Sequence, residues 1–245
     1  MQLEGKTILV TGATSGIGHG TACRLLDLGC HVVAIGRNGA RLDELAALAP
    51  QRVTAVPFDL LEFDTYRARV ENLPPVDGVV HSAGVVDNNP IRFFSLEKYQ
   101  RLIAINQTAP LLLTAELARA NKINQGGAVV FVASINGPTV AIKGCAAYAA
   151  SKAALLGITK VLALEMGHKN IRVNCVSPGM VETEMTAGLT QLSEEALRAD
   201  RARYPLGGRY AQVREVADSI AYLLSPAAGF VTGQNLIIDG GYSVQ

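Results

Sequence analysis

A tyrosine and a lysine stand four residues apart in the stretch AAYAASK, as Tyr148 and Lys152. On a helix, these two side chains lie one turn apart on the same face. A tyrosine hydroxyl has a pKa of about 10, so its phenolate is scarce near neutrality. A neighbouring ammonium group stabilises the phenolate and moves that pKa toward the working pH, which makes the pair a candidate acid and base. An isolated pair of this spacing is equally compatible with a core tyrosine and a lysine that reaches solvent.

A glycine-rich turn, TGATSGIGHG, follows the apolar run ILV and precedes a helical pattern. Gly12, Gly16 and Gly18 would let the backbone turn tightly and approach a pyrophosphate at the N-terminus of that helix. The spacing is G-x-x-x-G-x-G instead of the common G-x-G-x-x-G. A strand before the turn and a helix after it favour a dinucleotide site over an ordinary glycine-rich loop.

The second predicted strand ends in AIGRN, which bears on the choice of dinucleotide. NAD sites usually carry an acidic residue at this place to bind the ribose hydroxyls. Here Gly36 stands in that place and Arg37 follows it. A missing carboxylate removes repulsion of a 2′-phosphate, and a guanidinium can bind that phosphate, so NADP(H) is favoured. The alternative is that Arg37 is a solvated loop cation.

Short runs rich in β-branched residues alternate with longer helical patterns along the chain. Strands are predicted in KTILVTG, HVVAIG, RVTAVPF, DGVVHSA, GAVVFVAS, IRVNCVS and NLIID. Helices are predicted at roughly 16–29, 40–49, 62–73, 95–124, 146–168 and 212–225. This alternation predicts an α/β fold, a doubly wound parallel sheet with helices on both faces. We expect one domain over 1–245, with an insertion at about 180–209 that covers a ligand.

Composition narrows the class of partner. The 245 residues are 49% hydrophobic with a mean hydropathy of +0.24, and 22 basic against 21 acidic residues give a net charge of +1. No basic patch or tail points to nucleic acid or to a membrane, so a small-molecule partner is expected.

The first residues lack the pattern of a secretory leader, and charged residues interrupt the apolar stretches, so we expect a cytoplasmic protein. The cysteines lack metal-binding spacing, so reduced thiols and no metal site are expected.

Several motifs occur in the order typical of one family. They are Thr11-Gly12-x-x-x-Gly16-x-Gly18, Asp59, Ala83-Gly84, Asn106, Ser134, Tyr148-x-x-x-Lys152 and Pro178-Gly179 followed by Thr183. In these motifs, which span essentially the whole chain, the sequence resembles the short-chain dehydrogenase/reductases. The resemblance implies a seven-stranded Rossmann-like sheet and an NAD(P)-dependent oxidoreductase that acts on ketones and secondary alcohols.

The predicted catalytic residues are Asn106, Ser134, Tyr148 and Lys152. Ser134 ends a predicted strand, where its hydroxyl would hold the substrate oxygen near Tyr148, although a turn or helix cap is the plainer reading. Asn106 lies in the apolar stretch IAINQTAPLLL, where an amide is costly unless bonded and Pro110 loosens the helix. The resemblance implies that Asn106 positions Lys152 through a water and feeds a proton relay. A helix kink satisfied by the amide is compatible with that role.

The remaining predicted contacts concern the cofactor. By resemblance, Asp59 meets the adenine amino group, and Val181 and Thr183 hold the nicotinamide. The full predicted set is Thr11, Gly12, Ser15, Gly16, Ile17, Gly18, Arg37, Asp59, Leu60, Ala83, Gly84, Tyr148, Lys152, Pro178, Gly179, Val181 and Thr183. One departure from the family pattern is His81-Ser82, which replaces the usual Asn-Asn; we interpret His81 as structural.

The substrate is less defined than the cofactor. The predicted substrate contacts are Ser134, Asn136, Val140, Cys145 and Tyr148, with no fixed charge for a carboxylate. We predict an NADP(H)-dependent carbonyl reductase. The alternatives are a 3-oxoacyl-acyl-carrier-protein reductase, with Lys122, Lys143, Lys169 and Arg172 as candidates for carrier docking, and a non-catalytic dinucleotide sensor or scaffold. Apolar residues on more than one face of 95–124 and 146–168 predict a homotetramer or homodimer.

Overall fold

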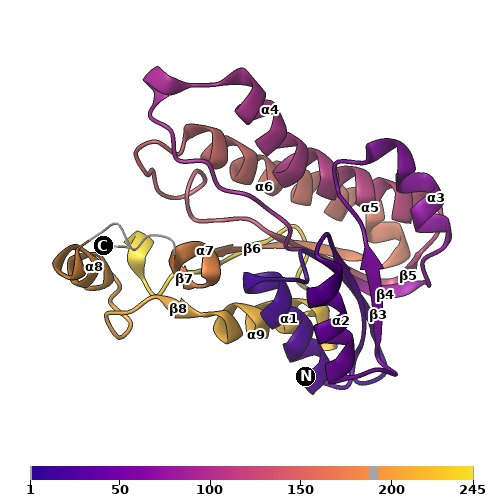
Figure 1. The fold of residues 1–245 in the computed structure, drawn as a ribbon. Coiled ribbons are helices and arrows are strands. Elements are labelled where there is room, and N and C mark those ends of the chain that lie inside the picture. The colour runs from indigo at the N-terminus through magenta and orange to yellow at the C-terminus, as the bar shows by residue number, and fades with distance from the viewer. Residues whose placement is uncertain (1, 188–192, 245) are drawn as a thin grey trace.

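Seven parallel strands form one sheet in the order β3-β2-β1-β4-β5-β6-β9 (Figure 1). The computed structural model describes residues 2–187 and 193–244. All seven predicted strands are confirmed within this part of the chain. Their bounds are β1 Thr7–Thr11, β2 His31–Gly36, β3 Val53–Pro57, β4 Val76–His81, β5 Ile123–Val132, β6 Arg172–Pro178 and β9 Asn235–Ile238.

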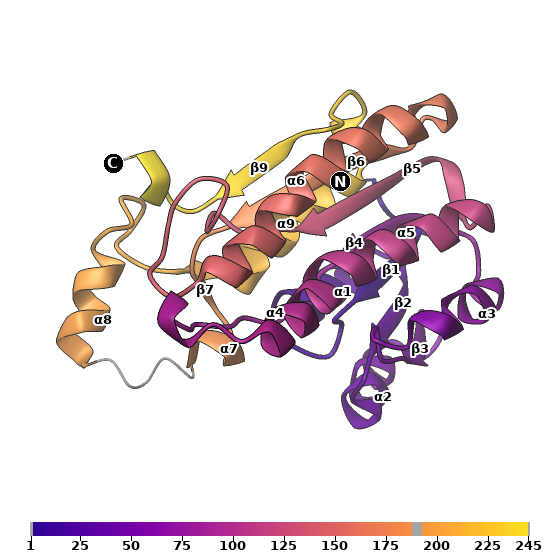
Figure 2. The same ribbon diagram turned by 90° about the horizontal axis from the view of Figure 1, so that it is seen from above.

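Helices cover both faces of the sheet, as the alternating pattern predicted (Figures 1 and 2). One face carries α1 Gly16–Asp27, α2 Gly39–Leu48 and α9 Val213–Leu224. The other carries α3 Tyr66–Glu71, α5 Ala109–Arg119 and α6 Ala146–Met166, with α4 Leu96–Ile103 before α5. Short 3₁₀ turns lie at η1 Phe63–Thr65, η2 Ile91–Phe93, η4 Gly167–Lys169, η5 Pro226–Ala228 and η6 Tyr242–Val244. The α/β doubly wound fold is therefore confirmed.

The strands divide their apolar side chains between the two helix layers. In β1, Ile8 and Val10 belong to the core shared with α1, α2 and α9, whereas Leu9 belongs to the core shared with α3, α5 and α6. Successive side chains of a strand point to opposite faces, so a strand buried on both sides is apolar throughout. This burial is why the β1 run reads as continuous ILV.

The helical pattern expected at 95–124 is not one helix. It consists of α4, a π-helical segment η3 over Ala104–Thr108, and α5. Pro110 follows this segment and lacks the N–H that a regular helix would use. π-helical turns within α-helices are rare and occur mostly at functional sites. The prediction also ended this helical region too late in the chain, at 124, because β5 begins at Ile123.

A subsidiary unit lies beyond the carboxyl ends of the strands; it overlaps the expected insertion at 180–209 and extends to Gln212 (Figure 2). It comprises β7 Val181–Glu182, α7 Glu184–Ala187, α8 Glu194–Arg201 and β8 Ala211–Gln212. β7 pairs in parallel with β8, so the segment returns to the sheet just before α9. The part of the predicted lid at 188–192 lies outside the described residues.

Helix α6 and the turn after it, Ala146–Lys169, form one helix among the described residues that is long and apolar enough to cross a membrane by length and composition. Its inner face, however, carries the buried polar residues Ser151, Lys152 and Thr159. The amine of Lys152 donates to a carbonyl of β5, so this face is built to lie against the sheet. We therefore interpret α6 as a core helix of the α/β fold.

Candidate active site

The glycine turn lies at the switch point of the sheet, where the strand order changes direction between β1 and β4. Gly12 has a φ of +68°, and a Cβ atom added there would lie 2.8 Å from the Cα atom of Ala83. A Cβ atom at Gly18 would lie 2.2 Å from the carbonyl oxygen of Gly12. Neither position has room for a side chain, because the β1 turn, the start of α1 and the end of β4 are in close contact. Glycine is therefore required here by packing.

The hydroxyl of Thr11 holds this turn together from the inside. It accepts hydrogen bonds from the backbone N–H groups of Ser82 and Ala83, both at 3.2 Å. Thr11 is only 1% exposed. In this structure the side chain of Thr11 fixes the position of Ala83, and its contact with a cofactor stays a prediction.

The N-terminus of α1 is open toward the crevice. Ser15 precedes the helix, is exposed, and caps none of its N–H groups. The first turn of α1 contains no acidic residue. Unbonded N–H groups and the positive end of the helix dipole make such a terminus suited to a phosphate. Gly16 and Ile17 belong to this turn, and a Cβ atom at Gly16 would have the methyl group of Thr183 at 3.6 Å as its nearest neighbour.

The end of β2 also matches a nucleotide site. Gly36 is buried, and a Cβ atom there would lie 2.5 Å from the Cγ2 atom of Thr14. The missing acidic side chain thus leaves space that the Thr14 methyl group fills. Arg37 is exposed and forms no hydrogen bond or ion pair with the described residues. Its guanidinium is free to meet a ligand.

Asp59 and Leu60 follow β3, at the same edge of the sheet. One carboxylate oxygen of Asp59 accepts from the backbone N–H of Leu61 at 3.0 Å, which closes a tight turn. The carbonyl of Leu60 accepts from the hydroxyl of Tyr66. Both residues thus shape the turn after β3, and the second carboxylate oxygen of Asp59 stays available to a ligand.

Tyr148 and Lys152 lie one turn apart on α6, and the Lys152 amine is 5.8 Å from the centre of the Tyr148 ring. Ser134 follows β5 and its hydroxyl is hydrogen-bonded to the side chain of Tyr148. The same hydroxyl accepts from the backbone N–H of Asn136 at 3.1 Å, which orients it. The structure thus brings together the three predicted residues at the carboxyl edge of the sheet.

Burial sets the acidity of the pair. It raises the pKa of the Tyr148 hydroxyl, and the hydrogen bond from Ser134 opposes that rise. It lowers the pKa of the Lys152 amine to about 8. The sequence predicted that Lys152 would lower the pKa of Tyr148; in the structure the desolvation of the phenol is the larger effect. A protonated Tyr148 suits a proton donor.

Asn106 lies in the π-helical segment and is 1% exposed. Its amide oxygen accepts from the backbone N–H of Val85 at 2.8 Å, and its amide nitrogen donates to the carbonyl of Val85 and to the hydroxyl of Ser151. Ser151 in turn donates to the carbonyl of Tyr148. The side chain of Asn106 therefore ties the loop after β4 to the first turn of α6.

Gly84 connects this network to the lysine. A Cβ atom there would lie 3.3 Å from both the amine of Lys152 and the amide oxygen of Asn106. Ala83 and Gly84, which follow β4, place little or no side chain beside Lys152. These small residues, the uncapped α1 terminus and Arg37 follow β4, β1 and β2 at the carboxyl edge of the sheet, where a dinucleotide would bind.

Pro178 ends β6 and Gly179 follows it, and a Cβ atom at Gly179 would lie 3.2 Å from Asp239. The carbonyl of Val181 accepts from the hydroxyl of Thr186 at 2.7 Å. The backbone N–H of Thr183 donates to the same hydroxyl. Val181 was predicted to meet the nicotinamide through its backbone, and its carbonyl is bonded within the lid in this structure.

His81, at the end of β4, is a core residue. Its ring stacks on Phe131 with centroids 4.9 Å apart, and its Nε2 atom lies 2.8 Å from the hydroxyl of Thr114. That hydroxyl donates to the carbonyl of Pro110, so we assign the proton to Nε2 of His81. Burial lowers the pKa of His81 to about 3, which keeps the ring neutral. The structural interpretation of His81 agrees with these contacts.

The predicted substrate contacts lie in the loop between β5 and α6. Asn136 forms a β-bridge with Val140, and both lie near the start of α6. The amide of Asn136 hydrogen-bonds to the thiol of Cys145, whose pKa is raised by burial. Asn136 is 3% exposed and Cys145 6%, so both side chains are buried beneath the loop.

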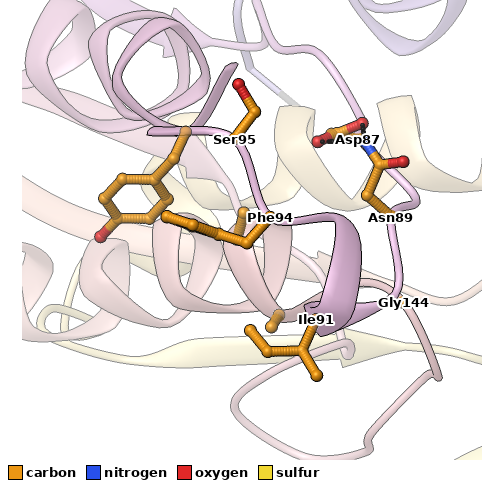
Figure 3. A pocket seen from close by; sticks show the side chains of 9 residues that line it. Asp87, Asn89, Ile91, Phe94, Ser95 and Gly144 are labelled. Atoms are coloured by element: carbon orange, nitrogen blue, oxygen red, sulfur yellow. Dashed lines mark hydrogen bonds between the residues drawn. The ribbon is translucent and has the colours of Figure 1, made fainter. Parts of the chain in front are cut away.

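Sequence reasoning did not single out the segment from Asp87 to Tyr99, which lines a small pocket (Figure 3). The rest of the lining comes from Gly144, in the loop before α6, and from Ala146 and Ala147, which directly precede Tyr148 in the chain. Figure 3 shows Asp87 and Asn89 pointing toward one another, and the amide nitrogen of Asn89 donates to the Asp87 carboxylate at 2.8 Å. The only signal in the sequence was that VVDNNPIRFFS interrupts the alternation of strands and helices directly after Gly84.

Most of the basic residues proposed for carrier docking lie away from the loop between β5 and α6. Lys122 precedes β5 at the opposite edge of the sheet and donates to the carbonyls of Glu71 and Leu73. Lys169 follows α6 and donates to Asn121. Arg172 is buried and donates to three carbonyls at the end of α9. Lys143 alone of the four lies beside the pocket loop.

The fold and this edge of the sheet define a class: an oxidoreductase that binds a dinucleotide at the switch point of a doubly wound sheet. A family model described as enoyl-(acyl carrier protein) reductase matches residues 12–243. The 3-oxoacyl-(acyl-carrier-protein) reductase of Rickettsia felis is 33% identical over 241 residues, which cover 98% of each chain. The L-xylulose reductase of Mesocricetus auratus is 36% identical over 245 residues, covering 99% of this chain and 98% of that one.

A comparison with solved structures leads to the same family. A crystal structure described as an NAD(P)-dependent gluconate 5-dehydrogenase from Beutenbergia cavernae, with NADP bound at low occupancy, superposes with a TM-score of 0.91 at 33% identity. The match covers 100% of this chain and 99% of that one. The chain belongs to the short-chain dehydrogenase/reductase family, and it is an oxidoreductase that acts on CH–OH groups.

Proposed function

We propose that the protein is an NADP(H)-dependent carbonyl reductase that interconverts a ketone and a secondary alcohol. The observation that carries this proposal is the placement of Tyr148 between the hydroxyl of Ser134 and the buried amine of Lys152. Reduction of a carbonyl requires a hydride at carbon and a proton at oxygen, where negative charge develops. Three groups at one edge of the sheet can supply the proton and hold the oxygen.

NADPH, when bound, supplies the hydride to the carbonyl carbon. The hydroxyl of Tyr148 gives its proton to the carbonyl oxygen and becomes a phenolate. Ser134 donates a hydrogen bond to the same oxygen and holds it beside Tyr148, and the ammonium of Lys152 stabilises the phenolate. Asn106 holds Val85 and Ser151, and through them the loop before the pocket and the first turn of α6.

The preference for NADP(H) over NAD(H) rests on the end of β2. Gly36 offers no carboxylate to the ribose, and the space beside it is filled by the methyl group of Thr14. Arg37 is exposed and free of ion pairs with described residues. A guanidinium with free N–H donors binds a phosphate in a bidentate manner, so a 2′-phosphate has a partner and no competitor at this position.

Reduction of a 3-oxoacyl thioester on a carrier protein is the second candidate. It is favoured by the relative from Rickettsia felis, whose name states that reaction. An acidic carrier would need basic residues around the pocket mouth. Lys143 lies in the loop before α6, and Arg92 stacks on Phe93 in the segment 87–99 that lines the small pocket. Two cations make a small docking surface, so we rank a free carbonyl compound first.

The catalytic proposal replaces the alternative of a non-catalytic sensor or scaffold. A sensor would need the nucleotide crevice alone, whereas this chain also places Ser134, Tyr148, Lys152 and Asn106 together.

We propose that the enzyme works as a homotetramer or homodimer in the cytoplasm. Leu111 on α5 and Val161 and Leu164 on α6 are exposed, Leu164 to 83%. A second exposed apolar group, Leu236 and Ile237, lies on the edge strand β9. Two separate apolar faces are what a tetramer with two kinds of twofold contact requires. Light scattering coupled to size-exclusion chromatography measures the assembly, and a monomer at micromolar concentration would contradict it.

A substrate panel tests the proposed reaction. Purified protein is incubated with NADPH or NADH and with ketones, keto sugars and a 3-oxoacyl thioester, free and carrier-bound, while absorbance at the nicotinamide band is followed. The proposal expects oxidation of NADPH with a free ketone or keto sugar at a higher kcat/KM than with NADH. Turnover of the carrier-bound thioester alone would favour the second candidate, and no turnover with any member would contradict a reductase.

A further inference from the structure

An arginine that the sequence patterns do not single out connects three parts of the nucleotide crevice. Arg41 lies in the first turn of α2, and its Nη1 atom donates to the carbonyl of Thr14 at 3.2 Å and to the carboxylate of Glu184 at 3.0 Å. Thr14 belongs to the glycine turn, and Glu184 is the first residue of the lid helix α7. One side chain therefore spans from the nucleotide-binding turn to the lid.

The position of this guanidinium places it beside the end of β2. Thr14, to which it is bonded, is also the residue whose methyl group fills the space at Gly36. In a doubly wound fold the ribose 2′ position lies at the end of this strand. Arg41 is thus bonded to the residue that packs against the end of β2, and it stands four positions after Arg37 in the chain.

The ion pair between Arg41 and Glu184 is weak enough for a phosphate to replace the carboxylate. The side chains of Arg41 and Glu184 are 41% and 68% exposed, and ion pairs between exposed groups are weak and screened by salt. Only the Nη1 atom of Arg41 is hydrogen-bonded to described residues, so its Nε and Nη2 donors remain available. A phosphate monoester carries about −1.5 to −2 charges at pH 7 and three acceptor oxygens. It is a stronger partner for a guanidinium than one exposed carboxylate.

We infer that Arg41 is a second ligand of the 2′-phosphate of NADP, held by Glu184 until the cofactor binds. This inference rests on the proposed preference for NADP(H). In the free protein Glu184 neutralises Arg41 and ties α7 to the glycine turn. A bound 2′-phosphate takes over the guanidinium, and the freed carboxylate of Glu184 is repelled from the new anion. NADPH therefore breaks the link between α2 and the lid, and NADH leaves it intact.

Three variants test the exchange by measured dissociation constants for NADPH and NADH. Arg41→Gln removes the proposed ligand and should weaken NADPH by about ten-fold or more, the loss expected for a hydrogen bond to a charged group. Its effect on NADH should stay within about two-fold. Glu184→Gln removes the competitor and should tighten NADPH by about two- to five-fold, the range of one exposed ion pair, with NADH unchanged.

Arg67→Gln is the control, because Arg67 also forms an ion pair between exposed side chains, with Glu71 on α3, away from the crevice. It should leave both dissociation constants unchanged, and circular dichroism confirms that each variant is folded. Hydrogen exchange of the lid amides supplies a second readout: NADPH should change the protection of 184–187 in the wild type more than NADH does, and this difference should disappear in Arg41→Gln.

The outcomes separate this inference from the proposed function. If Arg37→Gln weakens NADPH binding selectively while Arg41→Gln does not, the assignment of Arg41 as a second phosphate ligand is wrong. The proposed preference for NADP(H) then stands. If the wild type binds NADH as tightly as NADPH, the proposed preference itself fails. An unchanged NADPH affinity in Glu184→Gln would overturn the exchange, even where Arg41→Gln behaves as expected.

Discussion

The amine nitrogen of Lys152 donates a 2.7 Å hydrogen bond to the carbonyl oxygen of Val132. This bond ties α6 to the last residue of β5, two residues before Ser134. It fixes the lysine one turn from Tyr148 and removes its amine from solvent. Because burial then lowers the pKa of Lys152 to about 8, the charge that supports the phenolate depends on pH within the working range.

The rate of carbonyl reduction should therefore fall as the pH rises through about 8, where the free enzyme loses the proton of Lys152. A neutral amine no longer stabilises the phenolate that forms on Tyr148. Lys152→Met should lower kcat by about a hundred-fold or more and abolish this alkaline decline. The measurement is kcat/KM for reduction between pH 6 and pH 10. The same decline near pH 8 in both proteins would assign it to another group.

Gly36→Asp should shift cofactor preference toward NADH, because a carboxylate at the end of β2 repels a 2′-phosphate and accepts from ribose hydroxyls. The new side chain would meet the Cγ2 methyl group of Thr14, which a Cβ atom approaches to 2.5 Å. Combining the substitution with Thr14→Ala removes that contact. The ratio of kcat/KM for NADPH to that for NADH should invert in the double variant.

Thr14→Ala alone is the control for this pair and should keep the preference of the wild type. A double variant that loses both cofactors equally would show that Gly36 serves packing alone.

Gly18→Ala should destabilise the protein by about 1–3 kcal/mol, the usual range for an added methyl group in a packed site. The added Cβ atom would lie 2.2 Å from a backbone oxygen of Gly12, so the turn itself must move. Cofactor affinity should fall with it. Urea unfolding measures the first effect and fluorescence titration with NADPH the second.

Gly167→Ala is the matched substitution at an unconstrained site. Gly167 has helical backbone angles of φ −59° and ψ −29°, and a Cβ atom there meets nothing within 4 Å. Alanine should leave stability unchanged or raise it by about 0.4–1 kcal/mol, with cofactor affinity unaffected. If both variants lost the same amount of stability and cofactor affinity, the close packing at Gly18 would not be the cause of the loss.

Stability should depend on pH through His81. Burial lowers its pKa in the folded protein to about 3, against 6.5 for the free side chain, so below pH 6.5 the unfolded chain binds the extra proton. The free energy of unfolding should therefore fall as the pH falls, by about 2 kcal/mol between pH 7 and pH 5 from this group. His81→Asn removes the titrating ring and should flatten the profile over that window. A variant with the same slope as the wild type would contradict the assignment.

The strands were predictable because a strand buried on both faces is continuously apolar; β2 runs over His31–Gly36 as predicted from the sequence. The start of β5 was not predictable. Gly126 and Gly127 read as a turn, yet Gly126 takes a φ of +78° inside the strand, and the pairing with β4 shifts register near that point. Local patterns place elements but miss irregularities that a neighbouring strand imposes.

The candidate site, like the fold, was predictable from the sequence only in part. Tyr148, Lys152 and Ser134 were identified from residue type and spacing, and the structure brings them together. The π-helical turn at Asn106 and the contact of Arg41 with Glu184 depend on packing between segments far apart in the sequence, 143 residues apart for the ion pair. The stretch before α4, from Asp87 to Phe94, has no periodic pattern, so only its position after Gly84 pointed to the pocket.

The most direct test of the account is the turnover of Tyr148→Phe, measured with NADPH and the best ketone from the substrate panel. This change removes the hydroxyl and keeps the ring, so the fold and the crevice should persist. The account predicts that NADPH still binds within about two-fold of the wild-type dissociation constant, while kcat falls by a factor on the order of 10²–10⁴, the contribution of general acid catalysis. A variant that keeps wild-type kcat would contradict the assignment of Tyr148 as the proton donor.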